Sequence, residues 1–200
     1  MNANELKEVL ELHKKWLNND ESGKRADLSN ANLAGAILSN ADLSNADLRR
    51  ANLAGAILSN ADLKRADLCD ANLRVTDLRR ADLRDANLCG TDLRRANLAG
   101  AILSNADLKR ADLCDANLAG ADLYNADLDF SCLPLWCFSL TSQMDDRQVI
   151  QLLYHTLSIA QNSKYVSEEM KSVLLTKTNL EIANRFHRVG ECGVLKGVEE

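Results

Sequence analysis

The sequence predicts an all-β solenoid, in which the chain winds into a stack of similar coils. Across residues 26–130 one five-residue phrase repeats twenty-one times without a gap. The phrase reads alanine, then usually aspartate or asparagine, then leucine, then two variable residues. Leucine holds the third position of every phrase, and the first position is alanine except at Thr76 and Thr91. Such regularity favours a stacked repeat over a protein built around one irregular site.

The period of five excludes both standard elements in their straight form. A helix advances by about 100° per residue, so successive leucines would be rotated by roughly 140° and would spread over every face. In a straight strand, an odd period would send Leu28 and Leu33 to opposite faces. A short extended piece that bends once per phrase places all leucines on one side. Ala26 and Leu28 then point inward, Asp27 points outward, and the two variable residues form the bend.

The repeated A(D/N)LXX phrase resembles the pentapeptide repeat family. That resemblance implies a right-handed, four-sided parallel β-helix in which four phrases make one turn. Residues 20 positions apart would then lie directly above one another at the usual strand spacing of about 4.8 Å. Twenty-one phrases correspond to about five turns.

Residues 2–19 carry apolar side chains at the spacing of one helix face. These are Leu6, Val9, Leu10, His13, Trp16 and Leu17. We expect a capping helix within residues 1–25 that ends near Gly23 and covers the first coil, with His13 and Trp16 packed on the Leu28 layer. A partner-binding helix is the alternative interpretation.

After residue 127 the phrase gives way to bulky apolar residues, which predict a plug over the last coil. The structural cap residues are accordingly Trp16 at the first end and Leu133, Trp136 and Phe138 at the second. Residues 145–159 have helical periodicity, and Thr178 and Glu181 have the spacing of a capping box. We therefore expect three parts: a capping helix in residues 1–25, a β-helix in residues 26–133, and a plug with a helical region in residues 134–200.

Composition favours a cytoplasmic protein without a membrane segment. The chain has 200 residues and a net charge of −5, and no apolar run approaches the eighteen or so residues that span a bilayer. Six cysteines are expected to be reduced, because a large repetitive core does not need disulfides. Cys69 and Cys89 would stack, although parallel side chains usually lie alongside each other without bridging.

The sequence carries no pattern typical of an enzyme, a metal site or a cofactor site. Leucine and alanine fill the predicted interior, and all three histidines lie outside the repeats. Cys132, Cys137 and Cys192 lack the paired spacing of zinc ligands. We expect no catalytic residue, no metal and no cofactor.

Fourfold stacking assigns the outward aspartates to columns, and two neighbouring columns form an acidic edge. The acidic edge comprises Asp27, Asp47, Asp67, Asp107 and Asp127 in one column and Asp42, Asp62, Asp82 and Asp122 in the other. Pairs of basic residues such as Arg49 and Arg50 are scattered over all sides by the same stacking. Without a basic stripe or an aromatic platform, direct binding to nucleic acid is not expected.

Two non-enzymatic hypotheses follow. In the first, the solenoid is a rigid scaffold that presents its flat sides, or its C-terminal helices, to an unknown protein partner. In the second, resemblance to the quinolone-resistance branch of the family implies a DNA mimic whose stacked carboxylates occupy a type II topoisomerase such as gyrase. Residues 147–160 could also form a homodimer interface. Ice binding is disfavoured because Thr76 and Thr91 both occupy inward positions.

Overall fold

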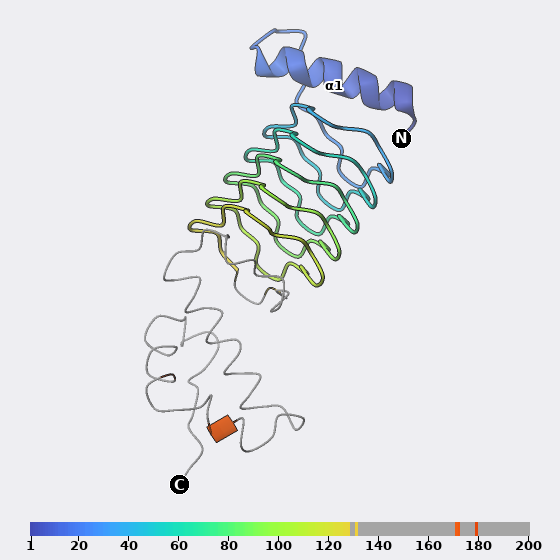
Figure 1. The fold of residues 1–200 in the computed structure, drawn as a ribbon. Helices are drawn as coiled ribbons and strands as arrows, with labels where there is room; N and C mark the ends of the chain where they lie inside the picture. Colours follow the sequence, from blue (N-terminus) through green and yellow to red (C-terminus); the bar gives the residue numbers. More distant parts are fainter. Residues whose placement is uncertain (129–130, 132–170, 173–178, 180–200) are drawn as a thin grey trace. The chain divides into compact units, whose positions relative to one another are not determined.

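The computed structural model describes residues 1–128, 131, 171–172 and 179. The chain divides into two compact units, Met1–Met144 and Asp145–Glu200. In the first unit, helix α1 (Ala3–Leu17) is followed by a stack of coils built from residues 26–128. Figure 1 shows α1, in blue, lying across the first coil of the stack. In the second unit, Lys171, Ser172 and Asn179 have helical backbone.

The coils stack in the register that four phrases per turn predict. Parallel bridges join residues 20 positions apart along the whole stack, from Asp27 with Asp47 to Asp107 with Asp127. Each bridge is flanked by two backbone hydrogen bonds, such as Leu28 N–H to Asp47 C=O (2.7 Å) and Asp47 N–H to Ala26 C=O (3.0 Å). These ladders confirm the four-sided parallel β-helix. The residue bounds expected for the capping helix, the β-helix and the C-terminal region remain a prediction.

The four sides can be named by the phrases that build them. The first side begins at residue 26 and the second at residue 31, and each continues every 20 residues along the chain. The third side begins at residue 36 and the fourth at residue 41.

A tight turn ends every phrase and produces the corner between two sides. The N–H of the next alanine donates to the leucine carbonyl, as from Ala31 to Leu28 at 3.1 Å. The last residue of each phrase has a positive φ, between 55° and 68° at every described corner. This left-handed conformation is easiest for glycine and asparagine, which occupy many of these positions.

Val75 is the least suitable of these corner residues, because its branched Cβ crowds the following peptide at a φ of 57°. Its side chain is exposed, so it gains little from packing in exchange. Replacing Val75 by asparagine should raise the free energy of unfolding by about 1 kcal/mol, measured by urea denaturation. The reverse change at the corner residue Asn60 should lower it by a similar amount, and an unchanged midpoint in both variants would contradict this account.

Leucine and alanine form the interior, as the phrase predicts. All twenty-one leucines of the repeats are almost completely buried, and so are the alanines at the first position of each phrase from the second coil onward. The two threonines of the alanine layer are buried with their hydroxyls satisfied: Thr76 Oγ1 donates to Leu53 C=O (3.0 Å) and Thr91 Oγ1 to Leu88 C=O (2.7 Å). Apolar side chains therefore form nearly all of the described interior of the coils.

Helix α1 is defined by strong local signals at both ends. The Asn2 side chain accepts the N–H groups of Asn4 and Glu5, and Glu5 accepts the Asn2 N–H in return, which completes a capping box. Lys14 and Lys15 in the last turn suit the negative end of the helix dipole. The helix packs Leu6, Val9 and Leu10 against the core of the first coils.

His13 fixes α1 to the solenoid, and Trp16 stacks on it from a partly exposed position. His13 is fully buried, and its Nδ1 accepts the backbone N–H of Ala26 at 3.1 Å. Trp16 stacks on the His13 ring with centroids 5.6 Å apart and keeps 37 % of its surface exposed. His13 thus makes the buried contact with the first coil, and the packing of Trp16 on the Leu28 layer remains a prediction. The other predicted cap residues, Leu133, Trp136 and Phe138, lie outside the described residues, as do residues 147–160.

The contact at His13 predicts a pH-dependent attachment of α1. Burial lowers the pKa of His13 from its ordinary 6.5, with Arg25 acting in the same direction and Asp42 and the Ser44 carbonyl opposing it. Its Nε2 is buried and has no hydrogen-bond partner within the described part of the chain. Protonation at Nδ1 would remove the acceptor for Ala26, so the neutral ring is the bound form.

Because the folded pKa lies below the unfolded one, the contribution of His13 is complete above pH 6.5 and declines as the pH falls below it. Hydrogen exchange of the α1 amides should therefore accelerate between pH 7 and pH 5 relative to the coil amides, after correction for intrinsic rates. A His13→Gln variant should show no such change over that range. An equal acceleration in the variant would show that another group titrates.

Candidate interaction surfaces

The aspartates of the acidic edge stack in the predicted register. Their carboxylates, however, accept hydrogen bonds from the backbone of the corner turns. In the phrases of residues 26–125 that have aspartate or asparagine at the second position, this side chain accepts the N–H of the residue two positions later, for example Ser29 N–H to Asp27 Oδ1 at 3.1 Å. The same bond forms from Ser44 to Asp42 and from Tyr124 to Asp122. These side chains stabilise the corner turns, which explains why aspartate and asparagine alternate freely at this position.

Basic side chains at the corners neutralise most of the acidic edge. Lys64 Nζ lies 2.7 Å from Asp62 Oδ2 and 3.3 Å from Asp82 Oδ2, one coil away. Lys109 spans Asp107 and Asp127 in the same manner, at 3.4 and 3.2 Å. Each lysine therefore separates two stacked carboxylates that would otherwise repel each other.

Arg49 performs the same role on the first side. It pairs with Asp47 and lies 3.7 Å from the Asp67 carboxylate of the next coil. Hydrogen bonds from Arg49 hold the pKa of Asp47 below its usual value against the opposing effect of burial. Only 15 % of the Asp47 side chain is exposed. Six of the nine residues of the acidic edge are paired with a cation among the described contacts: Asp47, Asp62, Asp67, Asp82, Asp107 and Asp127.

Two uncharged residues interrupt the acidic columns. Asn87 stands in the first-side column and donates its amide to Asp67 Oδ1 at 2.9 Å. Ile102 stands in the fourth-side column between Asp82 and Asp122. The columns are therefore neither continuous nor strongly charged, in contrast to the evenly spaced phosphates of DNA.

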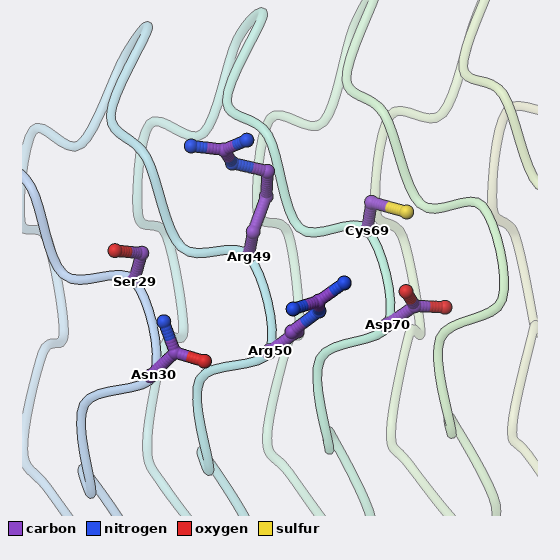
Figure 2. A pocket seen from close by; sticks show the side chains of 6 residues that line it. All are labelled: Ser29, Asn30, Arg49, Arg50, Cys69 and Asp70. Carbon is purple, nitrogen blue, oxygen red and sulfur yellow. The ribbon is translucent and has the colours of Figure 1, made fainter.

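A shallow hollow lies over three successive coils of the first side. It encloses about 410 Å³ and is lined by Ser29, Asn30, Arg49, Arg50, Cys69 and Asp70. Figure 2 shows that the Cys69 sulfur is directed away from Arg49, toward the following coil. Burial, and then the charge of Asp70, raises the pKa of the Cys69 thiol to about 11. A thiol that stays protonated at neutral pH is a poor nucleophile, so the hollow does not have the chemistry of a cysteine enzyme.

The cysteines differ in their state. Cys69 and Cys89 are free thiols, whereas Cys114 takes part in a disulfide. The expectation that all six cysteines are reduced is therefore wrong at Cys114. Within the described part of the chain, no three histidine, cysteine or acidic side chains come together as metal ligands. No described helix has the length and apolar character needed to cross a membrane.

The sequence interpretation missed an uncharged patch at the first two coils. Residues 31–40 and 51–60 have the same sequence and differ by 20 positions, so the second and third sides of these coils carry the same residues in stacked pairs. Ile37 is 78 % exposed, and Ile57 beneath it is 38 % exposed. Asn52 donates its amide to Asn32 Oδ1 at 3.3 Å. The identity of two runs exactly one coil apart was the signal that could have located this patch.

A groove lies between the N-terminal half of α1 and the first coil. It encloses about 480 Å³, and Leu6 and Leu10 of α1 face Leu33, Ala36 and Ile37 of the coil across it. The first-coil alanines at positions 31, 36 and 41 remain partly exposed, unlike the buried alanines of later coils. The helix therefore covers the end of the solenoid incompletely.

The chain matches the model of pentapeptide repeats, with eight copies over residues 26–65, 56–95 and 91–129. Two similar solved structures are cyanobacterial pentapeptide repeat proteins. One is alr5209 from Nostoc PCC 7120, with 29 % identity, 68 % of this chain and 95 % of that chain covered, and a TM-score of 0.41. The other is Rfr23 from Cyanothece 51142, with 28 % identity, 68 % and 93 % covered, and a TM-score of 0.36.

The plasmid-mediated fluoroquinolone resistance protein QnrB1 is a more distant likeness. It is 19 % identical, with 66 % of this chain and 83 % of that chain covered and a TM-score of 0.35. A comparison with curated proteins gave no significant match. Because the repeat model spans more than half of the 200 residues and the coils stack every 20 positions, this protein belongs to the pentapeptide repeat family.

Proposed function

We propose that this protein is a non-enzymatic, rigid solenoid that presents surfaces for binding another protein. The observation that carries the proposal is that the outward polar side chains already form hydrogen bonds and ion pairs within the solenoid. The outward aspartates hold the corner turns, and the basic side chains hold the aspartates. The interior is filled by leucine and alanine. What the molecule offers to solution is therefore shape and a fixed arrangement of side chains, which suits recognition better than chemistry.

Rigidity supports a scaffold role. The second, third and fourth coils are hydrogen-bonded to the coils on both sides, so a side chain on one of these coils has a fixed position relative to those above and below. A preorganised surface loses little conformational entropy when it binds a partner. The exposed Ile37 and Ile57 are apolar anchors on an otherwise uncharged patch, a composition that favours contact with protein over nucleic acid.

Affinity purification from the source cells tests this function. Tagged full-length protein is compared with a chain that ends near residue 141, and captured proteins are reconstituted in purified form. A partner that binds the full chain with a defined stoichiometry in calorimetry supports the scaffold. Equal binding by the shortened chain would assign recognition to the solenoid, and loss of binding would assign it to the C-terminal region. Failure of every reconstituted pair would remove the proposal.

The DNA-mimic hypothesis has one favourable feature, the stacking of carboxylates in two neighbouring columns. The ion pairs at Lys64 and Lys109 oppose it, because a mimic must offer its negative charge to the groove of the enzyme. We expect the purified protein neither to inhibit DNA gyrase supercoiling nor to protect the enzyme from quinolones.

The matched variant for this assay changes five residues of the acidic edge to asparagine: Asp27, Asp47, Asp67, Asp107 and Asp127. Asparagine retains the acceptor for the corner turn and removes the charge. Inhibition by the wild-type protein that disappears in this variant would replace the scaffold proposal by the mimic.

A further inference from the structure

The N-terminal rim of the solenoid is unevenly covered. On the first and fourth sides, His13 accepts the Ala26 N–H, and Arg25 donates from Nε to the Asn45 carbonyl. On the second and third sides, the first coil faces the groove beneath the N-terminal half of α1. Figure 1 shows this coil as the first turn of the stack, with no further turn before it. The segment of residues 31–38 is thus the exposed edge of two sheets; we name it the rim segment.

Backbone groups of the rim segment lack partners within the described part of the chain. These groups are the N–H of Asn32 and of Ile37 and the carbonyls of Asn32, Ala34 and Ile37. One coil further, the equivalent groups all bond to the rim segment. Asn52 exchanges two bonds with it at 2.9 and 2.7 Å, Ala54 accepts one at 2.9 Å, and Ile57 exchanges two at 2.9 and 2.8 Å. The rim segment could form the same five bonds on its free side.

Apolar surface adjoins these free groups. Ile37 has 78 % of its surface exposed, about twice the fraction of Ile57, although the two residues occupy equivalent positions. Leu6 and Leu10 form the opposite wall of the groove. Unpaired strand groups beside an apolar hollow are the two features that strand addition requires, hydrogen bonds for affinity and pockets for side chains.

We propose that the rim segment binds one extended peptide strand of a partner protein, which adds to the solenoid as a partial extra coil. The proposal rests on the scaffold function and locates its binding site. The strand would carry a small residue and, two positions later, a leucine or isoleucine, because this spacing fills the space that an alanine and a leucine fill between coils. An acidic residue beside this motif would pair with Lys7, the one charged side chain among the described residues that line the groove.

Continuity with the stacking interface identifies an extended strand as the occupant. The rim segment already pairs on its other side with residues 51–58, whose sequence is identical to its own. A strand of this composition is therefore known to fit the backbone spacing and the side-chain layer of residues 31–38. A helix would not present N–H and carbonyl groups along its edge in that order, because its backbone groups bond internally.

The probe is a fluorescein-labelled peptide with the sequence of residues 47–60, which includes Asp47 for Lys7 and Arg49 and Arg50 for solubility. Fluorescence anisotropy with full-length protein should give a saturable curve. A second peptide carries N-methyl groups on the amides of Leu53 and Leu58, which would donate to the rim carbonyls of Asn32 and Ile37 as Leu33 and Leu38 donate to Asn52 and Ile57. It should bind about tenfold more weakly because two hydrogen bonds are lost. Absence of binding up to about 1 mM peptide, or equal binding of both peptides, would overturn the proposal.

Two lysine variants distinguish the rim from the flat side. Ile37→Lys places a charge at the free edge, whereas Ile57→Lys places the same charge one coil away, where the backbone is paired on both sides. Both positions are exposed, so both variants should fold, as checked by circular dichroism. We expect about a tenfold loss of peptide binding for Ile37→Lys and a change within about twofold for Ile57→Lys. Equal losses would assign binding to the flat side and overturn the rim site.

The oligomeric state provides the remaining alternative. A concentration-dependent dimer that Ile37→Lys abolishes would make a second copy of this chain the occupant and would overturn the partner-strand proposal. The rim site and the scaffold function can be tested separately. A reconstituted partner that binds the wild-type and Ile37→Lys proteins equally would support the scaffold function and overturn the rim site.

Discussion

Replacing Leu73 by alanine is expected to lower the free energy of unfolding by about 2–5 kcal/mol. Leu73 is completely buried and lies between the coils that contain Leu53 and Leu93. Its removal would leave a cavity with rigid walls, because the hydrogen-bonded ladders on both sides prevent the neighbouring coils from moving inward. In a stacked repeat, the loss also weakens the contact between one half of the solenoid and the other. Urea denaturation followed by far-ultraviolet circular dichroism measures the change.

Leu33→Ala is the matched control, because Leu33 has the same place on the second side but lies in the first coil beside the groove. Water or a movement of Leu6 could fill the space that its side chain leaves, so the cavity cost should be smaller. We expect the Leu33 variant to lose clearly less stability than the Leu73 variant. Equal losses would mean that the first coil is packed as tightly as the middle of the stack.

Gly23→Ala is expected to detach α1 from the solenoid, at a cost of about 1–3 kcal/mol. A Cβ at position 23 would lie 2.5 Å from the carbonyl carbon of Lys15 and would also contact the backbone of Trp16. Backbone atoms cannot turn aside as a flexible side chain can, so either the helix or residues 20–25 must move. That movement would break the bond from Lys24 N–H to Leu12 C=O and the bond between Ala26 and His13.

Hydrogen exchange provides the measurement for Gly23→Ala. Amides of α1 should lose protection, while those of the middle coils keep theirs. Lys24→Ala is the control, since the Lys24 side chain is exposed and its backbone N–H, which the variant keeps, donates to the helix. Retained protection of α1 in the Gly23 variant would show that residues 20–25 can accommodate a methyl group.

The repeat region could be predicted closely because its information is local and repeated. The residue types in each phrase indicate which positions point inward and where the chain bends. A period other than five does not fit twenty-one consecutive repeats. Burial of the leucines, the pairing of residues 20 apart and the inward positions of Thr76 and Thr91 all agree with that interpretation. The four-sided coil itself came from resemblance to a family, since the period of five does not specify how many phrases close a turn.

The candidate site was less predictable. The sequence placed Asp62 and Asp82 in one column, but only the structure places Lys64 between them. Trp16 and His13 share one helix face, and their spacing cannot tell which ring enters the core. His13 does so because its ring nitrogen satisfies the otherwise unpaired N–H of Ala26. The groove and the rim segment depend on how far α1 extends across the first coil, which no local pattern encodes.

By itself, the sequence determined the repeating unit and the inward leucine and alanine layers, because these follow from side-chain period and turn chemistry alone. The alignment of outward residues into columns also needed the four phrases per turn that the family resemblance implies. The tertiary structure decided which charges are neutralised, which ring anchors the helix and which edge stays open. Those outcomes depend on contacts between residues 20 positions apart and between α1 and the first coil. Their strength is set by distances that exist only after the chain has wound.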